Sequence, residues 1–365
     1  MWRSVISTAA RNDRPPGLTE EKTMPLSEFD LIQRYFTPAA PAREDVIQGV
    51  GDDGAVLHVP IGMDLVVSID TLVSGVHFFP DVDPAALGYK ALAVNLSDMA
   101  AMGAEPAWAT LALTLPNVEE AWLAAFSRGF AELAERYGVQ LVGGDTCRGP
   151  LTVSVQMHGF VPQGAALRRA GAMPGDLIYV TGTLGDAGLA LQAVRNPQAL
   201  LEPHARYLMN RLERPSPRVF EGLALRGIAS AAIDISDGLA ADLGHILAAS
   251  EGRFRHPAPS MHGVGATLEI ERLPVSSAFV AVVQNAVQRD SCWQLPLSAG
   301  DDYELCFTVP ATKQAKVEQV FARFSCGATR IGVIESQPGL RCRLASGEML
   351  TPPSSGYQHF GKSSP

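Results

Sequence analysis

The sequence has few cysteines, no long apolar run and no excess of basic residues. Its five cysteines are scattered and form no CxxC pair, which argues against a disulfide framework or zinc site and favours a reducing cytoplasm. No apolar run approaches the ~18 residues of a membrane-spanning helix. Lysine and arginine total 29 against 38 aspartates and glutamates, a net charge of −9, so the basic footprint of a nucleic-acid binder is missing. If the protein binds phosphates, metal ions are the obvious means of neutralising them.

The composition is otherwise that of a globular protein. Over 365 residues, 47% are hydrophobic and 18% charged, which excludes a largely disordered chain and predicts two domains. Residues 1–23 are polar and lack periodicity, so we expect a disordered leader, or a true start at Met24. A stretch rich in Gly, Ala and Arg over 162–175 predicts a boundary between an N-terminal domain, 24–162, and a C-terminal domain, 163–365.

Hydrophobic periodicity predicts helices and strands in alternation along both halves. In the first half we expect helices over 24–36, 84–102 and 117–137 and strands over 55–59, 65–69 and 151–161. Asn117 and Glu120 have capping-box spacing, and Gly138 ends that helix. In the second half we expect strands over 176–181, 229–235 and 303–309 and helices over 186–195, 216–227, 237–250, 276–288 and 311–324. This pattern predicts an α+β fold of two mixed α/β domains.

The dominant chemical signal is a set of aspartates spread along the chain: Asp52, Asp53, Asp70, Asp98, Asp145, Asp234, Asp237, Asp301 and Asp302. Short, hard oxygen ligands that converge from several loops can hold more than one Mg²⁺ against substrate phosphates. Asp98 lies among apolar residues of an expected helix and Asp234 ends an apolar strand, where a carboxylate needs a paired charge or a metal. Any one of these aspartates could instead be a turn residue, and Asp237 could be the N-cap of the following helix.

Two glycine-rich stretches could bring backbone amides to a phosphate. Residues 143–146 follow an expected strand over 139–142, and residues 182–188 lie between a strand and a helix, where a plain tight turn is the alternative. Arg168 and Arg169 could clamp a nucleotide phosphate or form a solvated pair. Residues 356–363 match the GxxxxGKS pattern, but too few residues follow to build its helix, so we interpret the match as chance.

Seven blocks in unbroken order resemble the thiamine-monophosphate kinases, within the wider family of aminoimidazole-ribonucleotide synthetase-like ATP-binding proteins. The blocks are GDDGAVL, SIDTLVSGVHF, YKALAVNLSDMAAMGAEP, LVGGDTCRGP, YVTGTLGD, IDISDGLAADLGHI and AGDDYELCFTV, and the match spans roughly residues 26–360. The resemblance implies transfer of the γ-phosphoryl group of ATP to thiamine monophosphate, giving thiamine diphosphate, the last step of its biosynthesis. It also implies an N-terminal domain that dimerises through its β-sheet, a C-terminal α+β sandwich, and ATP with several Mg²⁺ ions held between the domains.

The resemblance further implies a set of site residues. Metal ligands fall on Asp53, Ser68, Asp70, Asp98, Asp145, Asp234 and Asp237. Nucleotide contacts fall on Gly144, Asp145, Arg169 and Ser236, and thiamine-phosphate contacts on His77, Asp301 and Tyr357, whose ring could cover the cationic thiazolium. At Ile69 the family usually has a hydroxyl residue, so a metal contact there would need the backbone carbonyl. At Asp301 the family commonly has Glu, which has a longer arm.

The implied reaction agrees with the residues. The phosphate of thiamine monophosphate is mostly dianionic above a second pKa of about 6, so it is already a nucleophile and needs no general base. The reaction requires suppressed repulsion between two polyanions and in-line positioning, which Mg²⁺ ions on aspartates supply. The sequence contains neither a GxSxG motif, which would indicate a covalent serine nucleophile, nor an HExxH motif, which would indicate a zinc hydrolase.

Other functions remain compatible with parts of the pattern. A sister enzyme of the same superfamily could make aminoimidazole ribonucleotide or selenophosphate, or act in hydrogenase maturation. A selenophosphate synthetase would show a reactive cysteine near the N-terminus, whereas the first cysteine here is Cys147, and the cysteine-containing end of a hydrogenase-maturation protein is absent. A non-catalytic nucleotide-binding regulator and a Mg²⁺-dependent phosphohydrolase are the alternatives from other classes.

Overall fold

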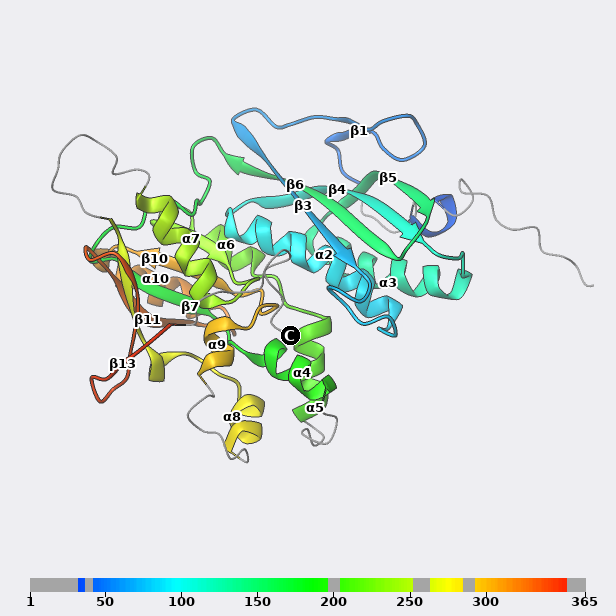
Figure 1. The fold of residues 1–365 in the computed structure, drawn as a ribbon. Coiled ribbons are helices and arrows are strands. Elements are labelled where there is room, and N and C mark those ends of the chain that lie inside the picture. Colours follow the sequence, from blue (N-terminus) through cyan, green and yellow to red (C-terminus); the bar gives the residue numbers. More distant parts are fainter. Residues whose placement is uncertain (1–31, 37–41, 196–203, 252–262, 285–292, 353–365) are drawn as a thin grey trace, which may run out of the picture.

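The computed structural model describes residues 32–36, 42–195, 204–251, 263–284 and 293–352. The chain forms a four-stranded sheet from its first half and a seven-stranded sheet from its second half, each with helices packed on it (Figure 1). The segment between 162 and 177, where we expect the domain boundary, carries the chain from one sheet to the other. Among the described residues, no helix combines the length and the apolar character that crossing a membrane would require.

The first sheet has the strand order β3-β6-β4-β5. Its strands are β3 (Met63–Val73), β4 (Glu105–Leu115), β5 (Gln140–Arg148) and β6 (Thr152–Pro162). β6 pairs antiparallel with β3 and β4, whereas β4 and β5 are parallel and are connected by a helical crossover, as parallel neighbours require. A separate pair, β1 (Val46–Gln48) with β2 (Val56–Leu57), packs apolar side chains against the end of the sheet.

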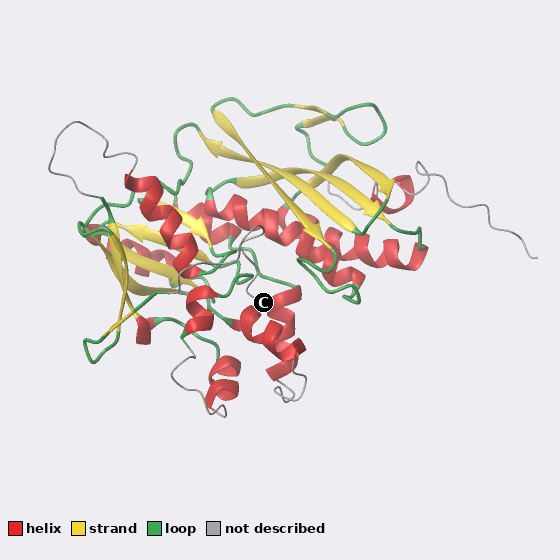
Figure 2. Ribbon diagram, in the orientation of Figure 1, coloured by secondary structure: helices red, strands yellow, loops and turns green. Residues whose placement is uncertain are grey.

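Helices α2 (Pro84–Ala101) and α3 (Glu120–Tyr137) cover one face of this sheet (Figure 2). The α2 N-terminus is stabilised because the Asp83 side chain accepts the Ala85 N–H at 2.9 Å and proline occupies the first turn. The two helices approach closely at Gly129, where a Cβ atom would lie 1.8 Å from the Ala85 carbonyl oxygen. Only glycine fits at this crossing.

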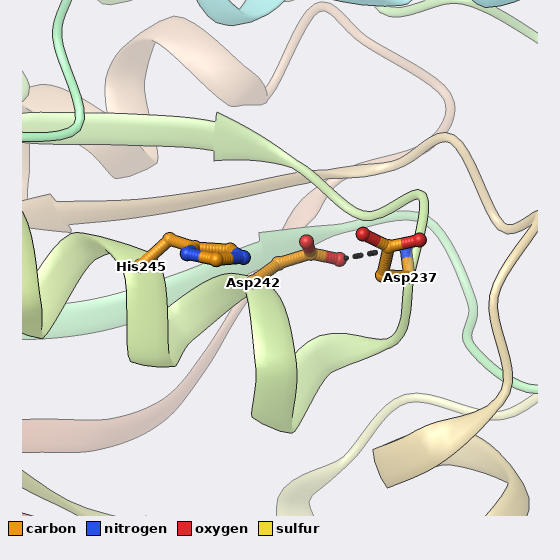
Figure 3. Close-up of side chains that lie close together, drawn as sticks. All are labelled: Asp237, Asp242 and His245. Carbon is orange, nitrogen blue, oxygen red and sulfur yellow. Dashed lines mark hydrogen bonds between the residues drawn. The ribbon is translucent and has the colours of Figure 1, made fainter. Parts of the chain in front are cut away.

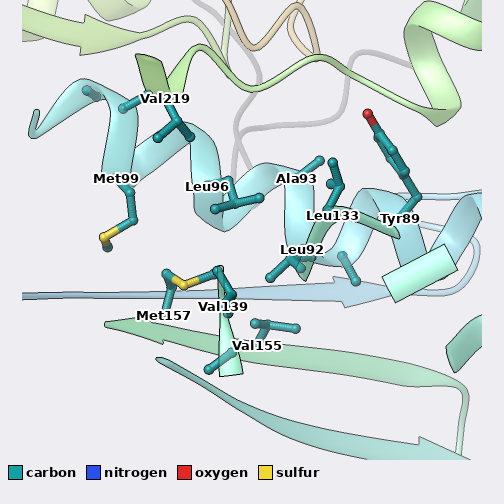
Figure 4. Packing of buried hydrophobic residues seen from close by; sticks show 14 of the residues in the cluster. Tyr89, Leu92, Ala93, Leu96, Met99, Leu133, Val139, Val155, Met157 and Val219 are labelled. Carbon is teal, nitrogen blue, oxygen red and sulfur yellow. The ribbon is translucent and has the colours of Figure 1, made fainter. Parts of the chain in front are cut away.

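The helix α2 is buried on almost every side. Toward the sheet, Leu92, Leu96 and Met99 pack with Met157 of β6, and the opposite side of the helix meets Val219 in the second half of the chain (Figure 4). A helix that is apolar all round lies inside a protein rather than on its surface. The helix α2 is therefore the element that both halves share.

The second sheet has the order β13-β12-β9-β11-β7-β10-β8, and its neighbours are antiparallel except for the parallel pair β12 and β9. Its strands are β7 (Leu177–Thr181), β8 (Ala231–Asp234), β9 (Gly265–Glu269), β10 (Leu305–Val309), β11 (Ala328–Glu335), β12 (Gly339–Arg343) and β13 (Met349–Leu350). The accompanying helices are α4 (Asp186–Arg195), α5 (His204–Glu213), α6 (Val219–Leu225), α7 (Leu239–Glu251), α8 (Ser277–Gln284), α9 (Gln294–Ser298) and α10 (Gln314–Phe321). Short 3₁₀ turns span Ile270–Arg272 and Ala311–Lys313.

The expected α+β class is confirmed, and several local expectations need correction. The helix expected from 117 begins at Glu120, and its N-cap Glu119 makes no side-chain capping bond, so the capping box is wrong; its end at Gly138, with φ 64°, is confirmed. Residues 143–146 belong to β5 rather than to a phosphate loop. The helix expected over 24–36 is described only over Ile32–Phe36, as a π-helix, and residues 1–23 lie outside the described residues.

Candidate active site

Three carboxylates from distant parts of the chain meet between the two sheets. Asp70 comes from β3, Asp98 from α2, and Asp234 is the last residue of β8. Ser68 donates its hydroxyl to the Asp98 carboxylate, and Ser97 donates to Asp234 Oδ2 at 2.8 Å. The helix α2 therefore positions the cluster: its residue Ser97 contacts Asp234 of the second sheet, and the next residue, Asp98, contacts Ser68 of the first sheet.

Burial and the mutual repulsion of the acids dominate the electrostatics of this cluster. Burial and the charge of Asp98 raise the pKa of Asp70 to about 7. Burial, then the charge of Asp98, raises the pKa of Asp234 to about 8. Burial also raises the pKa of Asp98, although the Ser68 hydrogen bond and the positive charge of Arg169 oppose it. Hard oxygen donors held together in this way fit Mg²⁺, whose charge would restore the ionised form.

The loop that follows β8 borders the cluster. The Asp242 carboxylate, in the first turn of α7, accepts the backbone N–H groups of residues 236, 237 and 238, each at 3.1 Å. Asp242 thus fixes the loop that precedes α7 and carries Asp237. Asp237, Asp242 and His245 also offer ligand atoms that lie within 4.8 Å of one another, with Asp242 in the middle (Figure 3). Burial, together with the charge of Asp237, raises the pKa of Asp242 to about 7.

A second loop, residues 300–304, packs against the first. The Asp301 N–H donates to the Ser236 carbonyl oxygen at 2.9 Å, and the Tyr303 N–H donates to that of Ile235 at 2.8 Å. Gly300 permits this contact, because a Cβ atom there would lie 2.2 Å from the Ser236 carbonyl oxygen. Two of the residues expected at the site, Ser236 and Asp301, are therefore adjacent.

Comparison with known proteins identifies the family. The model of the AIR synthase related protein N-terminal domain matches residues 51–161. The thiamine-monophosphate kinase of Escherichia coli K12 is 47% identical over 92% of this chain and 99% of its own length. The chain belongs to the thiamine-monophosphate kinase family.

Solved structures of the family have the same fold. The thiamine-monophosphate kinase of Stenotrophomonas maltophilia K279a is 44% identical and superposes with a TM-score of 0.77 over 88% of this chain and 98% of its own. AaThiL complexed with AMPPCP and TMP is 30% identical, with a TM-score of 0.70 over 93% of this chain and 100% of its own. These relatives match nearly the whole chain, so both sheets belong to the kinase fold.

Other residues that the family resemblance implicates lie away from the carboxylate cluster. Asp145 pairs with Ala112 near the end of β5, on the face of the sheet that α2 and α3 do not cover, and Gly144 precedes it in the same strand. Asp53 is exposed in the connection between β1 and β2, and within the described residues neither a hydrogen bond nor an ion pair joins it to the cluster. The side chain of Ile69 points to the same open face and is 61% exposed, opposite to Ser68 and Asp70.

The remaining positions have varied surroundings. His77 lies in the turn after β3, where its Nδ1 accepts the Val73 N–H at 3.0 Å. Arg169 is exposed in the segment before β7, close enough for its charge to act on Asp98. Tyr357 and the GxxxxGKS match lie outside the described residues. The glycine-rich stretch after β7 is a helix start: Thr183 bonds Asp186 at 2.8 Å, and the Gly185 amide is already bonded to Asp302.

Sequence reasoning missed several residues at this site. Ser97, Asp242, Lys90 and Tyr303 were not singled out, although each makes a polar contact to a predicted site residue or to the loop that carries one. For Lys90 a signal was present, because it is the one cation in the Ala/Leu-rich stretch over 84–102. A charged residue in a helix that is buried all round needs a partner.

Proposed function

We propose that Asp70, Asp98 and Asp234 are the centre at which this enzyme of the thiamine-monophosphate kinase family transfers the γ-phosphoryl group of ATP to thiamine monophosphate, giving thiamine diphosphate and ADP. The observation that carries the proposal is the convergence of three carboxylates with raised pKa values at the junction of the two sheets, where Asp234 is buried and Asp70 and Asp98 are half-buried. AaThiL complexed with AMPPCP and TMP supports the pair of substrates.

The donor set suits Mg²⁺. Ser68, Asp70, Asp98 and Asp234 would hold the ions near α2, with Asp237 beside them and Asp53 and Asp145 as further ligands. When bound, Mg²⁺ would neutralise the phosphate charges and so reduce the repulsion between the two polyanionic substrates. The carboxylates of Asp98 and Asp234 are fixed before substrate arrives, because the Ser68 and Ser97 hydroxyls already hold them.

The chain's own residues then position the two substrates. We assign the nucleotide to Gly144, Asp145, Arg169 and Ser236, and thiamine monophosphate to His77, Asp301 and Tyr357. Arg169 brings the positive charge that a nucleotide phosphate requires, and the influence of that charge on Asp98 supports a role for Arg169 beside the cluster. The attacking phosphate oxygen is already ionised at neutral pH, so no side chain is assigned as a general base or as a covalent nucleophile.

We further propose a homodimer formed through the open face of the first sheet. Leu65, Val67 and Ile69 alternate along β3 on this face and are 42%, 52% and 61% exposed. An apolar row of this kind on the open face of a sheet is suited to pairing with an identical surface. Asp145 lies on the same face, so a second copy of the chain would pack near part of the assigned nucleotide site.

The acidic net charge and the scattered cysteines support a cytoplasmic enzyme that binds neither nucleic acid nor membranes. The direct test uses the purified full chain with ATP, MgCl₂ and thiamine monophosphate, with thiamine diphosphate and ADP measured together. We expect the two products in equal amounts and only when all three components are present. ADP formed equally without thiamine monophosphate would indicate a phosphohydrolase and would refute the proposed function.

A further inference from the structure

Lys90 projects from α2 toward the second half of the chain. Its side chain is 5% exposed, and its Nζ lies 3.4 Å from Asp301 Oδ2, on the loop after the helix α9. A lysine is rarely so deeply buried without a partner, and loss of one member of a buried ion pair leaves the other charge uncompensated. The contact joins the helix of the carboxylate cluster to a residue that we assign to the substrate.

Tyr303 holds the other oxygen of the same carboxylate. Its hydroxyl donates to Asp301 Oδ1 at 2.9 Å, and burial, with the adjacent Asp301 charge, holds the pKa of Tyr303 well above its usual value, so the hydroxyl stays a donor. Asp301 and Tyr303 have φ values of 65° and 49°, a left-handed conformation that residues other than glycine adopt at a cost. The surrounding contacts must therefore stabilise this loop conformation.

The alternate residues of the loop provide that support. Asp302 accepts the Gly185 N–H with both oxygens, at 3.1 and 2.9 Å. Glu304 is fully buried and accepts from Thr181 at 2.7 Å, from Arg211 at 3.0 Å and from Arg218 Nε at 2.6 Å. These two acids fix the loop from the interior of the second half, while Asp301 reaches Lys90 of α2 and Tyr303.

We propose that Lys90 and Tyr303 are positioning residues that fix the Asp301 carboxylate for binding thiamine monophosphate. The inference rests on the proposed function, in which Asp301 contacts that substrate. Each partner holds one oxygen, and 27% of the Asp301 side chain stays exposed for a ligand. Because Lys90 shares α2 with Ser97 and Asp98, it also sets the distance between the substrate contact and the carboxylate cluster.

The test compares steady-state kinetics of Tyr303→Phe, Lys90→Met and Lys90→Arg with the unmodified chain. We expect Tyr303→Phe, which loses a hydrogen bond to the carboxylate, and Lys90→Met, which loses an ion pair with it, each to raise the KM for thiamine monophosphate about tenfold. The KM for ATP should stay within about twofold, and Lys90→Arg should recover most of the loss, because the cation is restored. Arg214→Met is the matched control: it removes a cation that joins Glu132 and the Tyr89 ring across the same junction without touching Asp301.

A double-mutant cycle separates positioning from other roles. In an Asp301→Ala background, Tyr303→Phe should have no further effect on the KM for thiamine monophosphate, because it acts only through the missing carboxylate. Undiminished effects in that background, or equal rises in both KM values, would overturn the inference even if Lys90→Met fails to fold. An unmodified chain that makes no thiamine diphosphate would instead refute the proposed function, so the two failures are distinguishable.

Discussion

The Ser97 hydroxyl donates to Asp234 Oδ2 at 2.8 Å and so connects α2 to the last residue of β8. The next residue on the helix, Asp98, accepts a hydrogen bond from Ser68 of β3. Successive residues on a helix point about 100° apart, so one helix can present side chains to two sheets that lie on different sides of it. The carboxylate cluster exists because α2 is inserted between the two halves of the chain.

Replacement of Ser97 by alanine should destabilise the protein. The buried Asp234 carboxyl group would lose its hydroxyl partner, which costs about 1–3 kcal/mol in the free energy of unfolding. Urea unfolding followed by circular dichroism measures this cost. Ser127→Ala is the control, because the Ser127 hydroxyl donates only to the Ala124 carbonyl oxygen within α3, at 3.3 Å. Equal losses in both variants would show that the Ser97–Asp234 bond has no special value.

Removal of charge from the cluster should abolish turnover with little effect on folding. Asp98→Asn and Asp70→Asn each keep the side-chain shape but remove a metal-binding charge, and we expect kcat to fall at least about 10²–10³-fold. The readout is the rate of thiamine diphosphate formation at saturating ATP and Mg²⁺. Asp64→Asn on the strand of Asp70 is the control, because Asp64 is exposed and, among the described residues, its carboxylate accepts only the Gly164 N–H, at 3.1 Å. Losses below about tenfold for both cluster variants would contradict the assigned roles.

The metal-free protein should become less stable as the pH rises. Asp70 and Asp234 have folded-state pKa values of about 7 and about 8, above the ordinary 3.8, so between about pH 4 and 8 the folded state binds more protons than the unfolded state. Stability is then fully present below pH 4 and is lost as the pH rises through 7 to 8. In EDTA we expect the melting temperature to fall by about 5 °C or more between pH 5 and 8.

Magnesium should reverse this loss where the ligands are ionised. Added MgCl₂ should raise the melting temperature at pH 8 far more than at pH 5, because protonated carboxyls do not bind the ion. A variant that combines Asp70→Asn with Asp234→Asn should show a flatter pH profile and a weaker response to Mg²⁺. A melting temperature in EDTA that rises from pH 5 to pH 8 would contradict the burial of ionisable acids at this site.

The order of the helices and strands follows well from local patterns, whereas the partners of the acids do not. The predicted helix over 84–102 agrees with α2 because alanine, leucine and Pro84 act locally. β4 was missed: it is buried on both faces for much of its length, so its pattern lacks the alternation of a half-exposed strand. Residues 143–146 have a loop composition but lie in β5 because pairing with β4 overrides local propensity.

In the candidate site, too, some residues could be selected from local sequence and others depend on long-range strand pairing. Asp98 and Asp234 could be selected from the sequence, because a carboxylate among apolar residues needs compensation wherever it lies. That Asp70 shares their cluster, while Ile69 and Asp145 face the other side of the sheet, depends on strand register and on one β-bulge before Gly143. These pairings join residues that are far apart in the sequence, so local sequence patterns do not reveal them. The contact of Lys90 with Asp301 is long-range in the same way.

Self-association through the open sheet face predicts a specific effect of charge. Val67 lies at the centre of the apolar row on β3 and is 52% exposed, so Val67→Lys would bury a charge if a second copy packs there. We expect the dimer dissociation constant, measured by analytical ultracentrifugation, to rise at least about tenfold. Val118→Lys is the control, because Val118 is 53% exposed in the connection just before α3 and is not part of the apolar row on β3. Because Asp145 lies on the same face, turnover should fall as the dimer dissociates in Val67→Lys and should stay unchanged in Val118→Lys. An unmodified chain that stays monomeric at high concentration would rule out this interface.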